Sequence, residues 1–248
     1  MSQAIHNLFE KLALFADLSA AERDELIRAS RIRNLKKNDF AFHHGAPCSS
    51  FFIVAGGAIR VHRETPDGKE VTLNIAIVGD TLGDHEMFEN RDSYQSSALA
   101  TEDSILIEYS TEWIKQKIRE HSDLALNMLA TISKSSSRLA IDKEHLVTLK
   151  TPQRIACFLL RLCALHDFNP SHFVLPYSKI TIASKLGMEP ESFSRALVKL
   201  KEVGVTVNGH DVQIANAPAL ENYVCSACSI AEDCESCRFH KIADWAEK

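Results

Sequence analysis

Residues Ser178–Leu200 read SKITIASKLGMEPESFSRALVKL, and this stretch decides the domain architecture. It contains two short helical patterns with a turn at Gly187 between them. A glycine at such a turn lets two helices cross, which is the helix-turn-helix arrangement. The apolar side chains that could fill the space between the helices belong to Ala183, Leu186, Phe193 and Leu197. The second half of the stretch is therefore predicted to be a helix that enters the major groove of DNA.

Three polar residues lie on one side of that predicted second helix: Glu191, Ser194 and Arg195, at positions i, i+3 and i+4. An arginine can donate two hydrogen bonds to a guanine, and a glutamate can accept one from a cytosine amino group. The same residues could also form a solvated helix face with no ligand. The following stretch Val205–Ile214 has the pattern of a β-hairpin and resembles a wing, which favours the DNA-reading interpretation.

The net charge of −5 has to be read segment by segment. Residues 176–210 hold five basic and three acidic residues, whereas residues 211–248 hold seven acidic and three basic ones. Acidity is concentrated near the C-terminal cysteines, so the global charge does not exclude a nucleic-acid ligand.

The segments before the helix-turn-helix predict a sheet-rich domain and a long helix. Short β-branched and aromatic runs separated by glycine turns fill residues 31–109, and Asp67-Gly68 is a strong hairpin signal. This spacing predicts an antiparallel barrel or jelly-roll. Residues at alternating steps of four and three then form a coiled-coil seam: Met128, Ile132, Ser135, Leu139, Asp142, Leu146 and Leu149. The seam favours pairing with a second copy over packing on the chain's own barrel.

Composition places the chain among ordinary globular proteins. Its 248 residues are 45% hydrophobic and 25% charged, with only 7 Pro and 9 Gly. No window approaches the ~18 apolar residues of a membrane helix, and the N-terminus lacks the apolar core of a signal peptide. We therefore expect a cytoplasmic protein with no membrane partner. Cys157 and Cys163 lie in an apolar helical pattern and are predicted to be inert core residues.

The order of barrel, long helix and winged helix resembles the Crp/Fnr family of bacterial transcription regulators, as far as about Ala219. The matching motifs are Phe51–Val61, Gly79–Asp84 and Glu191–Arg195, the last with the E-x-x-S-R pattern of the Fnr-like branch. The resemblance implies a non-enzyme that binds double-stranded DNA as a homodimer and works with RNA polymerase as an activator. It also implies TTGAT-like palindromic half-sites, with Glu191 and Arg195 reading the G·C pair and Ser194 contacting a neighbouring thymine.

With this resemblance the fold class is α+β, in four parts. These are a cyclic-nucleotide-binding-like β-roll sensor domain, a dimerisation helix, a winged helix-turn-helix DNA-binding domain and a cysteine-rich tail. Their predicted ranges are 1–110, 111–150, 151–219 and 220–248.

Members of this family that bind cyclic nucleotides hold the ribose with a glutamate and the phosphate with an arginine in an Arg-Ser/Thr-Ala run. The corresponding stretches here are Gly83–Phe88 and Gln95–Ala98, and Ser96 stands at the arginine position. Loss of the charge-assisted contact argues against cyclic AMP as the effector. Arg91 could substitute from the loop.

The tail holds Cys225, Cys228, Cys234 and Cys237, with the spacing C-x2-C-x5-C-x2-C. Four closely spaced thiolates favour a [4Fe-4S] cluster. The tail resembles that of the Bacillus-type Fnr, where three C-terminal cysteines and an aspartate of the dimer region hold the cluster. The fourth ligand is then either Cys237 or, on the seam, Asp142. The sensed signal would be oxygen, nitric oxide or redox state.

Three alternatives for the sensor stay open at this point. A structural zinc would usually have ~15–20 residues between its cysteine pairs, and a redox disulfide lacks the surrounding thioredoxin pattern. Haem could use His43, His44, His62 or His85, although no C-x-x-C-H motif is present. A catalytic or electron-carrying iron-sulfur protein is the competing class, but such a protein needs no helix-turn-helix.

Overall fold

The computed structural model describes residues 6, 9–10, 12–68, 70–165, 172–175 and 178–226. The chain divides into two compact units, Met1–Arg138 and Leu139–Lys248, and the long helix α5 runs through the boundary between them. This division is not the four-part division expected from the sequence, which stays a prediction. No helix among the described residues is long and apolar enough to cross a membrane.

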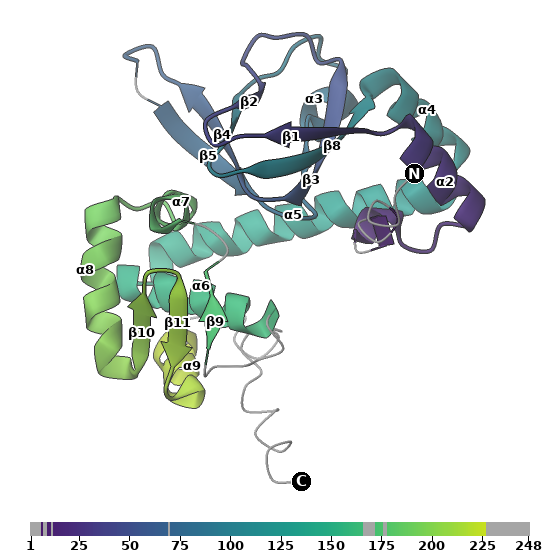
Figure 1. Cartoon of the computed structure of the whole chain (residues 1–248). Helices are drawn as coiled ribbons and strands as arrows, with labels where there is room; N and C mark the ends of the chain where they lie inside the picture. The colour runs from purple at the N-terminus through teal and green to yellow at the C-terminus, as the bar shows by residue number, and fades with distance from the viewer. Residues whose placement is uncertain are drawn as a thin grey trace, which may run out of the picture. The chain divides into compact units, whose positions relative to one another are not determined.

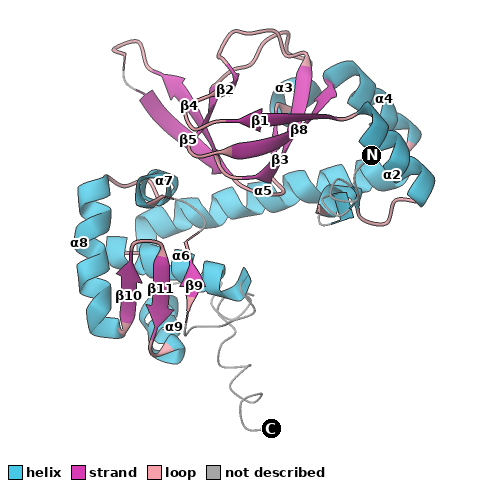
Figure 2. Ribbon diagram, in the orientation of Figure 1, coloured by secondary structure: helices cyan, strands magenta, loops and turns pink. Residues whose placement is uncertain are grey.

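The first unit is built on strands, and its helical elements before α5 are η1 (Ala13–Phe15), α2 (Ala20–Ala29), α3 (Asp84–Phe88) and α4 (Thr111–Glu120). Its strands are β1 (Arg31–Leu35), β2 (Phe40–Phe42), β3 (Ser50–Gly56), β4 (Ile59–Glu64), β5 (Glu70–Ala76), β6 (Thr81–Leu82), β7 (Ser97–Ala100) and β8 (Ser104–Ser110). They form two four-stranded antiparallel sheets, in the orders β1-β8-β3-β6 and β2-β7-β4-β5. Figures 1 and 2 show α2 and α4 at one end of these sheets. The predicted jelly-roll within an α+β fold is confirmed.

Strand β3 shows why the apolar run in this unit is uninterrupted. Successive side chains of a strand point to opposite faces. Phe51 and Ile53 pack with α2, α4 and α5, while Phe52 and Val54 pack against the second sheet. Both faces of β3 are thus buried, so no polar alternation is needed.

The predicted turns are confirmed where glycine was required. Gly68 closes the β4–β5 hairpin with a φ of +78°, and its N–H donates to the carbonyl of Thr65. Ser19 and Glu22 form a capping box at the start of α2.

Where the sequence suggests one dimerisation helix over residues 111–150, the structure has α4 and then α5 (Ser122–Thr148). The break is at His121, which has an extended conformation and whose Nδ1 lies 2.8 Å from Oε1 of Glu22 on α2. The seam on α5 is also only partly exposed. Met128 and Leu149 are buried within the chain, whereas Leu139 and Leu146 are 50% and 55% exposed.

The second unit contains the end of α5 and a winged helix-turn-helix. Its further helices are α6 (Thr151–Leu165), α7 (Lys179–Lys185), α8 (Pro190–Leu200), η2 (Lys201–Val203) and α9 (Ala217–Cys225). The strands β9 (Phe173–Val174), β10 (Val205–Asn208) and β11 (Asp211–Ile214) form an antiparallel sheet in the order β10-β11-β9. The expected hairpin over Val205–Ile214 is confirmed by the pairing of β10 with β11.

Cys157 and Cys163 lie on α6 and are buried, as expected for core residues. Burial raises the pKa of the Cys163 thiol to about 11, so this thiol stays protonated and unreactive at neutral pH.

Candidate nucleic-acid interface

The turn between α7 and α8 is fixed by one glycine and by one arginine of α6. Gly187 has a φ of +62°, a conformation that side-chain-bearing residues rarely adopt. Arg154 of α6 donates from Nη1 to the carbonyl of Leu186 at 3.0 Å, and its burial lowers the pKa of the guanidinium. The orientation of α7 and α8 is therefore tied to α6 through this contact.

Helix α8 packs through one side and leaves the other open to solvent. Phe193, Ala196 and Leu200 are buried against the rest of the unit. Ala183 is also buried, as expected, but Leu186 and Leu197 are only half-buried. Ala183 and Phe193 are thus the fully buried members of the predicted set.

The predicted reading residues Glu191, Ser194 and Arg195 are brought together on the open side of α8, and all three are exposed. Nη2 of Arg195 donates to Oγ of Ser192 at 3.2 Å. Within the described part of the chain, Glu191 and Ser194 carry no side-chain hydrogen bond. The face therefore presents one cation, one anion and one hydroxyl to solvent.

Sequence reasoning missed two residues of this face. Ser192 is three residues before Arg195, which is the helical spacing for a contact, and this spacing could have indicated its role. Val198 is 62% exposed and follows Arg195 by three residues. The sequence pattern did not indicate that Val198 is exposed, because apolar residues of a helix are first assigned to the core.

Only the beginning of the predicted metal site lies within the described residues. Cys225 is the last residue of α9, and its side chain, like Cys228, Cys234 and Cys237, lies outside the part that the structure describes. The last turn of α9 is held by Gln153 of α6, whose Nε2 donates to the carbonyl of Tyr223 at 3.0 Å. No group of three or more potential metal ligands occurs among the described residues.

Asp142, the alternative ligand, lies on α5 and is half-exposed. Its Oδ1 accepts a hydrogen bond from Nη1 of Arg161 on α6 at 3.3 Å. The carboxylate is therefore already paired with a cation in the same unit.

The stretch that corresponds to a cyclic-nucleotide cradle lies around α3, and its polar groups bond to the loop itself. Glu86 is buried, and its Oε1 accepts from the backbone N–H of Gln95 at 2.9 Å. Ser96, at the arginine position, is buried as well. Arg91 donates from Nε to Glu89 at 2.5 Å, so its guanidinium is paired next to α3.

The space between the two sheets near this stretch is filled by aromatic rings. The rings of Phe42 and Tyr94 stack with their centroids 3.8 Å apart, and the ring centroid of Phe52 lies 5.9 Å from that of Phe42. The Tyr94 hydroxyl donates to the carbonyl of Ser50, and burial raises the pKa of this phenol. Phe42 and Tyr94 are thus core residues beside this stretch, and Glu86 is bonded to its backbone.

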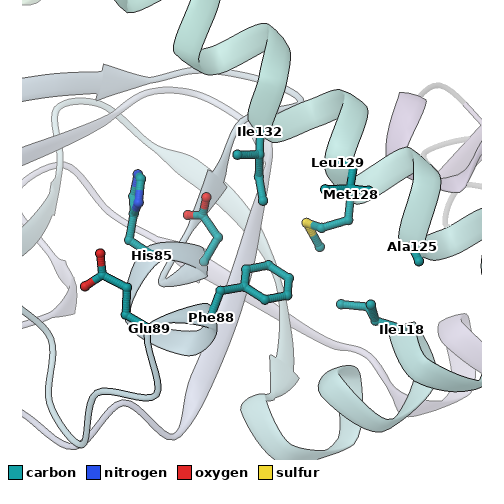
Figure 3. A pocket seen from close by; sticks show the side chains of 9 residues that line it. His85, Phe88, Glu89, Ile118, Ala125, Met128, Leu129 and Ile132 are labelled. Atoms are coloured by element: carbon teal, nitrogen blue, oxygen red, sulfur yellow. The ribbon is translucent and has the colours of Figure 1, made fainter.

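A groove of about 450 Å³ opens between α3, α4 and α5 in the first unit. Figure 3 shows the apolar side chains of Phe88, Ile118 and Met128 directed toward one another there, with His85 and Glu89 to one side. The remaining lining residues are Asp84, Ala125, Leu129 and Ile132. None of the lining residues is lysine or arginine. His85 could ligate a haem iron, but the anionic propionates of a haem would meet acidic side chains.

Comparisons with known proteins match both units. Residues 32–121 match the family described as cyclic nucleotide-binding domain, and residues 153–223 match the family described as Crp-like helix-turn-helix domain. The chain is 28% identical over 205 residues to the transcriptional activator protein FnrA of Stutzerimonas stutzeri. These aligned residues cover 79% of this chain and 81% of that protein. It is 22% identical over 194 residues to the anaerobic regulatory protein of Bacillus subtilis, with 77% and 82% covered.

A solved structure with the same architecture is that of a candidate cAMP-binding regulatory protein from Silicibacter pomeroyi. It is 27% identical, covers 90% of this chain and 99% of its own, and has a TM-score of 0.64. The likeness thus extends over the jelly-roll and the winged helix together.

Proposed function

Because this chain belongs to the Crp/Fnr family of DNA-binding transcription regulators, which are not enzymes, we propose that it binds palindromic DNA as a homodimer through α8. The observation that carries this proposal is the exposure of Glu191, Ser194 and Arg195 on one side of α8, while Phe193, Ala196 and Leu200 bury its other side. An α-helix fits the major groove, and its exposed side then faces the base edges.

Each of the three side chains has a partner in a TTGAT half-site. The guanidinium of Arg195 donates two hydrogen bonds to O6 and N7 of the guanine, and the carboxylate of Glu191 accepts from N4 of the paired cytosine. The hydroxyl of Ser194 contacts a neighbouring thymine. The contact between Arg195 and Ser192 already holds the guanidinium on the exposed side before DNA binds.

A palindrome requires two copies of α8, and α5 supplies a surface for pairing. Leu139 and Leu146 are seven residues apart on this helix and are about half exposed, as expected for residues that a second α5 covers. The dimer would present both α8 helices to successive major grooves. RNA polymerase is the expected protein partner on the bound promoter.

A fluorescence anisotropy titration tests the DNA proposal. Labelled TTGAT-N4-ATCAA duplex is compared with a scrambled duplex of the same composition at several salt concentrations. We expect affinity to fall with salt for both duplexes, while the preference for the palindrome persists. Equal affinity for the two duplexes at every salt concentration would exclude sequence-specific recognition of this motif.

We further propose that the four tail cysteines hold a [4Fe-4S] cluster that reports oxygen, nitric oxide or redox state. The support is the thiolate spacing in the sequence and the contact of α9 with α6, in which Gln153 of the first turn of α6 donates to the carbonyl of Tyr223, two residues before Cys225. The relative from Bacillus subtilis is named an anaerobic regulatory protein. A bound cluster supplies redox reactivity, and its ligation orders the tail next to the helix pair α5–α6.

For the fourth ligand, Cys237 is favoured over Asp142. The carboxylate of Asp142 would have to leave Arg161 before it could bind a metal, and this would leave the guanidinium without that ion pair. Cys237 has the same pair spacing from Cys234 as Cys228 has from Cys225.

Anaerobic purification with an absorption spectrum and iron, sulfide and zinc analysis tests the cluster. We expect a brown protein that air bleaches, and we expect Cys225→Ala, Cys228→Ala and Cys234→Ala to lose both the colour and specific DNA binding. Of Cys237→Ala and Asp142→Ala, only the variant of the true ligand should show the same loss. Cys48→Ala, which changes a half-buried cysteine of the first unit, is the matched control.

The same preparation separates the alternatives. A Soret band would identify haem, and a colourless protein with bound zinc would identify a structural zinc site. Full, air-insensitive DNA binding by a variant without the four tail cysteines would end the sensor proposal.

A further inference from the structure

Val198 is an exposed apolar residue on the side of α8 that carries the polar reading residues. The other apolar residues of this helix are buried, as Phe193, Ala196 and Leu200 are, or half-buried, as Leu197 is. Val198 is 62% exposed. Val198 is therefore the apolar residue of α8 whose side chain contributes least to the packing of the unit.

The helix geometry aligns Val198 with the reading residues. It follows Arg195 by three positions and Ser194 by four, so the three side chains form one stripe along the helix. With a rise of about 1.5 Å per residue, Val198 lies ~4.5 Å beyond Arg195 along the axis. That distance is close to the ~3.4 Å separation of stacked base pairs, so Val198 reaches a pair next to those read by Arg195 and Ser194.

The chemistry of a valine leaves one match at the edge of the major groove. An isopropyl group can neither donate nor accept a hydrogen bond, and the C5-methyl group of thymine is the apolar feature that the groove presents. Contact between the two removes apolar surface from water on both sides.

On the basis of the proposed function, we propose that Val198 packs against the C5-methyl group of one thymine in each half-site and is thereby a specificity-determining residue. Every other base at that position lacks the methyl group. Burial of one methyl group corresponds to about a fourfold change in affinity.

A thymine-to-deoxyuridine scan tests this inference, because deoxyuridine lacks only the methyl group. Each thymine of TTGAT-N4-ATCAA and of its complement is replaced symmetrically in both half-sites, and the full-length, anaerobically purified protein is titrated against each duplex. Wild type should lose about fourfold affinity per half-site at one position, and Val198→Ala should be insensitive to the same replacement. The substitution keeps the helix intact, since alanine is the better helix former and the site is exposed.

Val174→Ala is the matched control, because it makes the same chemical change at a 45% exposed valine on β9 of the same unit. This variant should show the wild-type scan. The inference is wrong if no deoxyuridine replacement lowers the affinity of wild type, or if the same replacement lowers the affinity of Val198→Ala as much as that of wild type. The preference for TTGAT would still stand in both cases. A protein with no preference for TTGAT over the scrambled duplex overturns the proposed function and this inference together.

Discussion

The exposed side of α8 and the stretch Gly83–Ala98 differ in what their polar side chains do in the isolated chain. On α8, Glu191 and Ser194 have no side-chain hydrogen bond to any residue that the structure describes, and Arg195 donates to Ser192. In the stretch around α3, the carboxylate of Glu86 accepts from Gln95, and the serine at the arginine position is buried.

The difference separates a surface that is ready for a ligand from one that has become part of the fold. A polar group that is exposed and unpaired keeps its hydrogen-bonding capacity for a partner. A buried group that is already paired has given part of its hydrogen-bonding capacity to the fold. The stretch around α3 departs from the family pattern at Ser96, whereas Glu191–Arg195 on α8 keeps that pattern.

The largest effect is expected from Phe42→Ala, which removes the central ring of the aromatic stack beside the stretch Gly83–Ala98. Phe42 is buried between Phe52 and Tyr94, so its truncation should lower the free energy of unfolding by about 3–5 kcal/mol. Chemical denaturation measures this loss. Phe88→Ala, at a 44% exposed ring, should cost less than half as much. If Phe42→Ala lowers the free energy of unfolding no more than Phe88→Ala does, the stack of Phe42 with Tyr94 does not stabilise the fold in the way we expect.

A pair of glutamate variants compares the two regions directly. Glu86→Ala leaves the backbone N–H of Gln95 without its buried acceptor and should lower the free energy of unfolding by about 1–3 kcal/mol. Glu191→Ala should change stability by less than about 0.5 kcal/mol but weaken discrimination at the G·C pair. The comparison fails if Glu191→Ala destabilises the protein as strongly as Glu86→Ala.

Ser192→Ala tests whether Arg195 is held in place before DNA binds. Loss of the hydroxyl frees the guanidinium, which must then be ordered on binding, and we expect specific affinity to fall by about two- to fivefold. Ser192→Thr keeps the hydroxyl and should bind nearly as wild type does. An unchanged affinity in the alanine variant would show that the contact does not matter.

The smallest effect is expected from the titration of His62 in the first unit. Its side chain is 7% exposed, and burial followed by the charge of Arg60 lowers its pKa. The unfolded chain then binds a proton more readily than the folded chain does. Stability is therefore complete above the ordinary histidine pKa of about 6.5 and declines as the pH falls below it.

Denaturation at pH 7.5 and pH 5.5 measures this decline, and His62→Gln should reduce it. Burial also lowers the pKa of His145 in the second unit, so part of the decline should persist in the variant. An identical decline in wild type and variant would show that His62 does not titrate in this range.

The sequence predicted those parts of the molecule that depend on local patterns. The turn at Gly187, the hairpin at Gly68 and the apolar run of β3 follow from backbone conformation and side-chain alternation. The stripe Glu191–Arg195 follows from helical spacing alone. These features need no knowledge of distant residues.

The remaining features depend on contacts between residues that are far apart in the chain. The break at His121 accompanies its contact with Glu22, 99 residues away. The filled cradle needs Phe42 to stack on Tyr94. Neither a helical nor a strand period contains information on such distant pairs, so the sequence patterns predict neither the break at His121 nor the stacked rings of Phe42 and Tyr94.

The most direct test of the account is the base discrimination of Arg195→Ala. Dissociation constants of wild type and variant are measured by anisotropy for the TTGAT palindrome and for a duplex with the G·C pair of both half-sites changed to A·T. Wild type should prefer the palindrome by about 1–3 kcal/mol per half-site, and the variant should bind both duplexes alike. If Arg195→Ala weakens binding to both duplexes equally and keeps the wild-type preference, α8 does not read the guanine and the account is wrong.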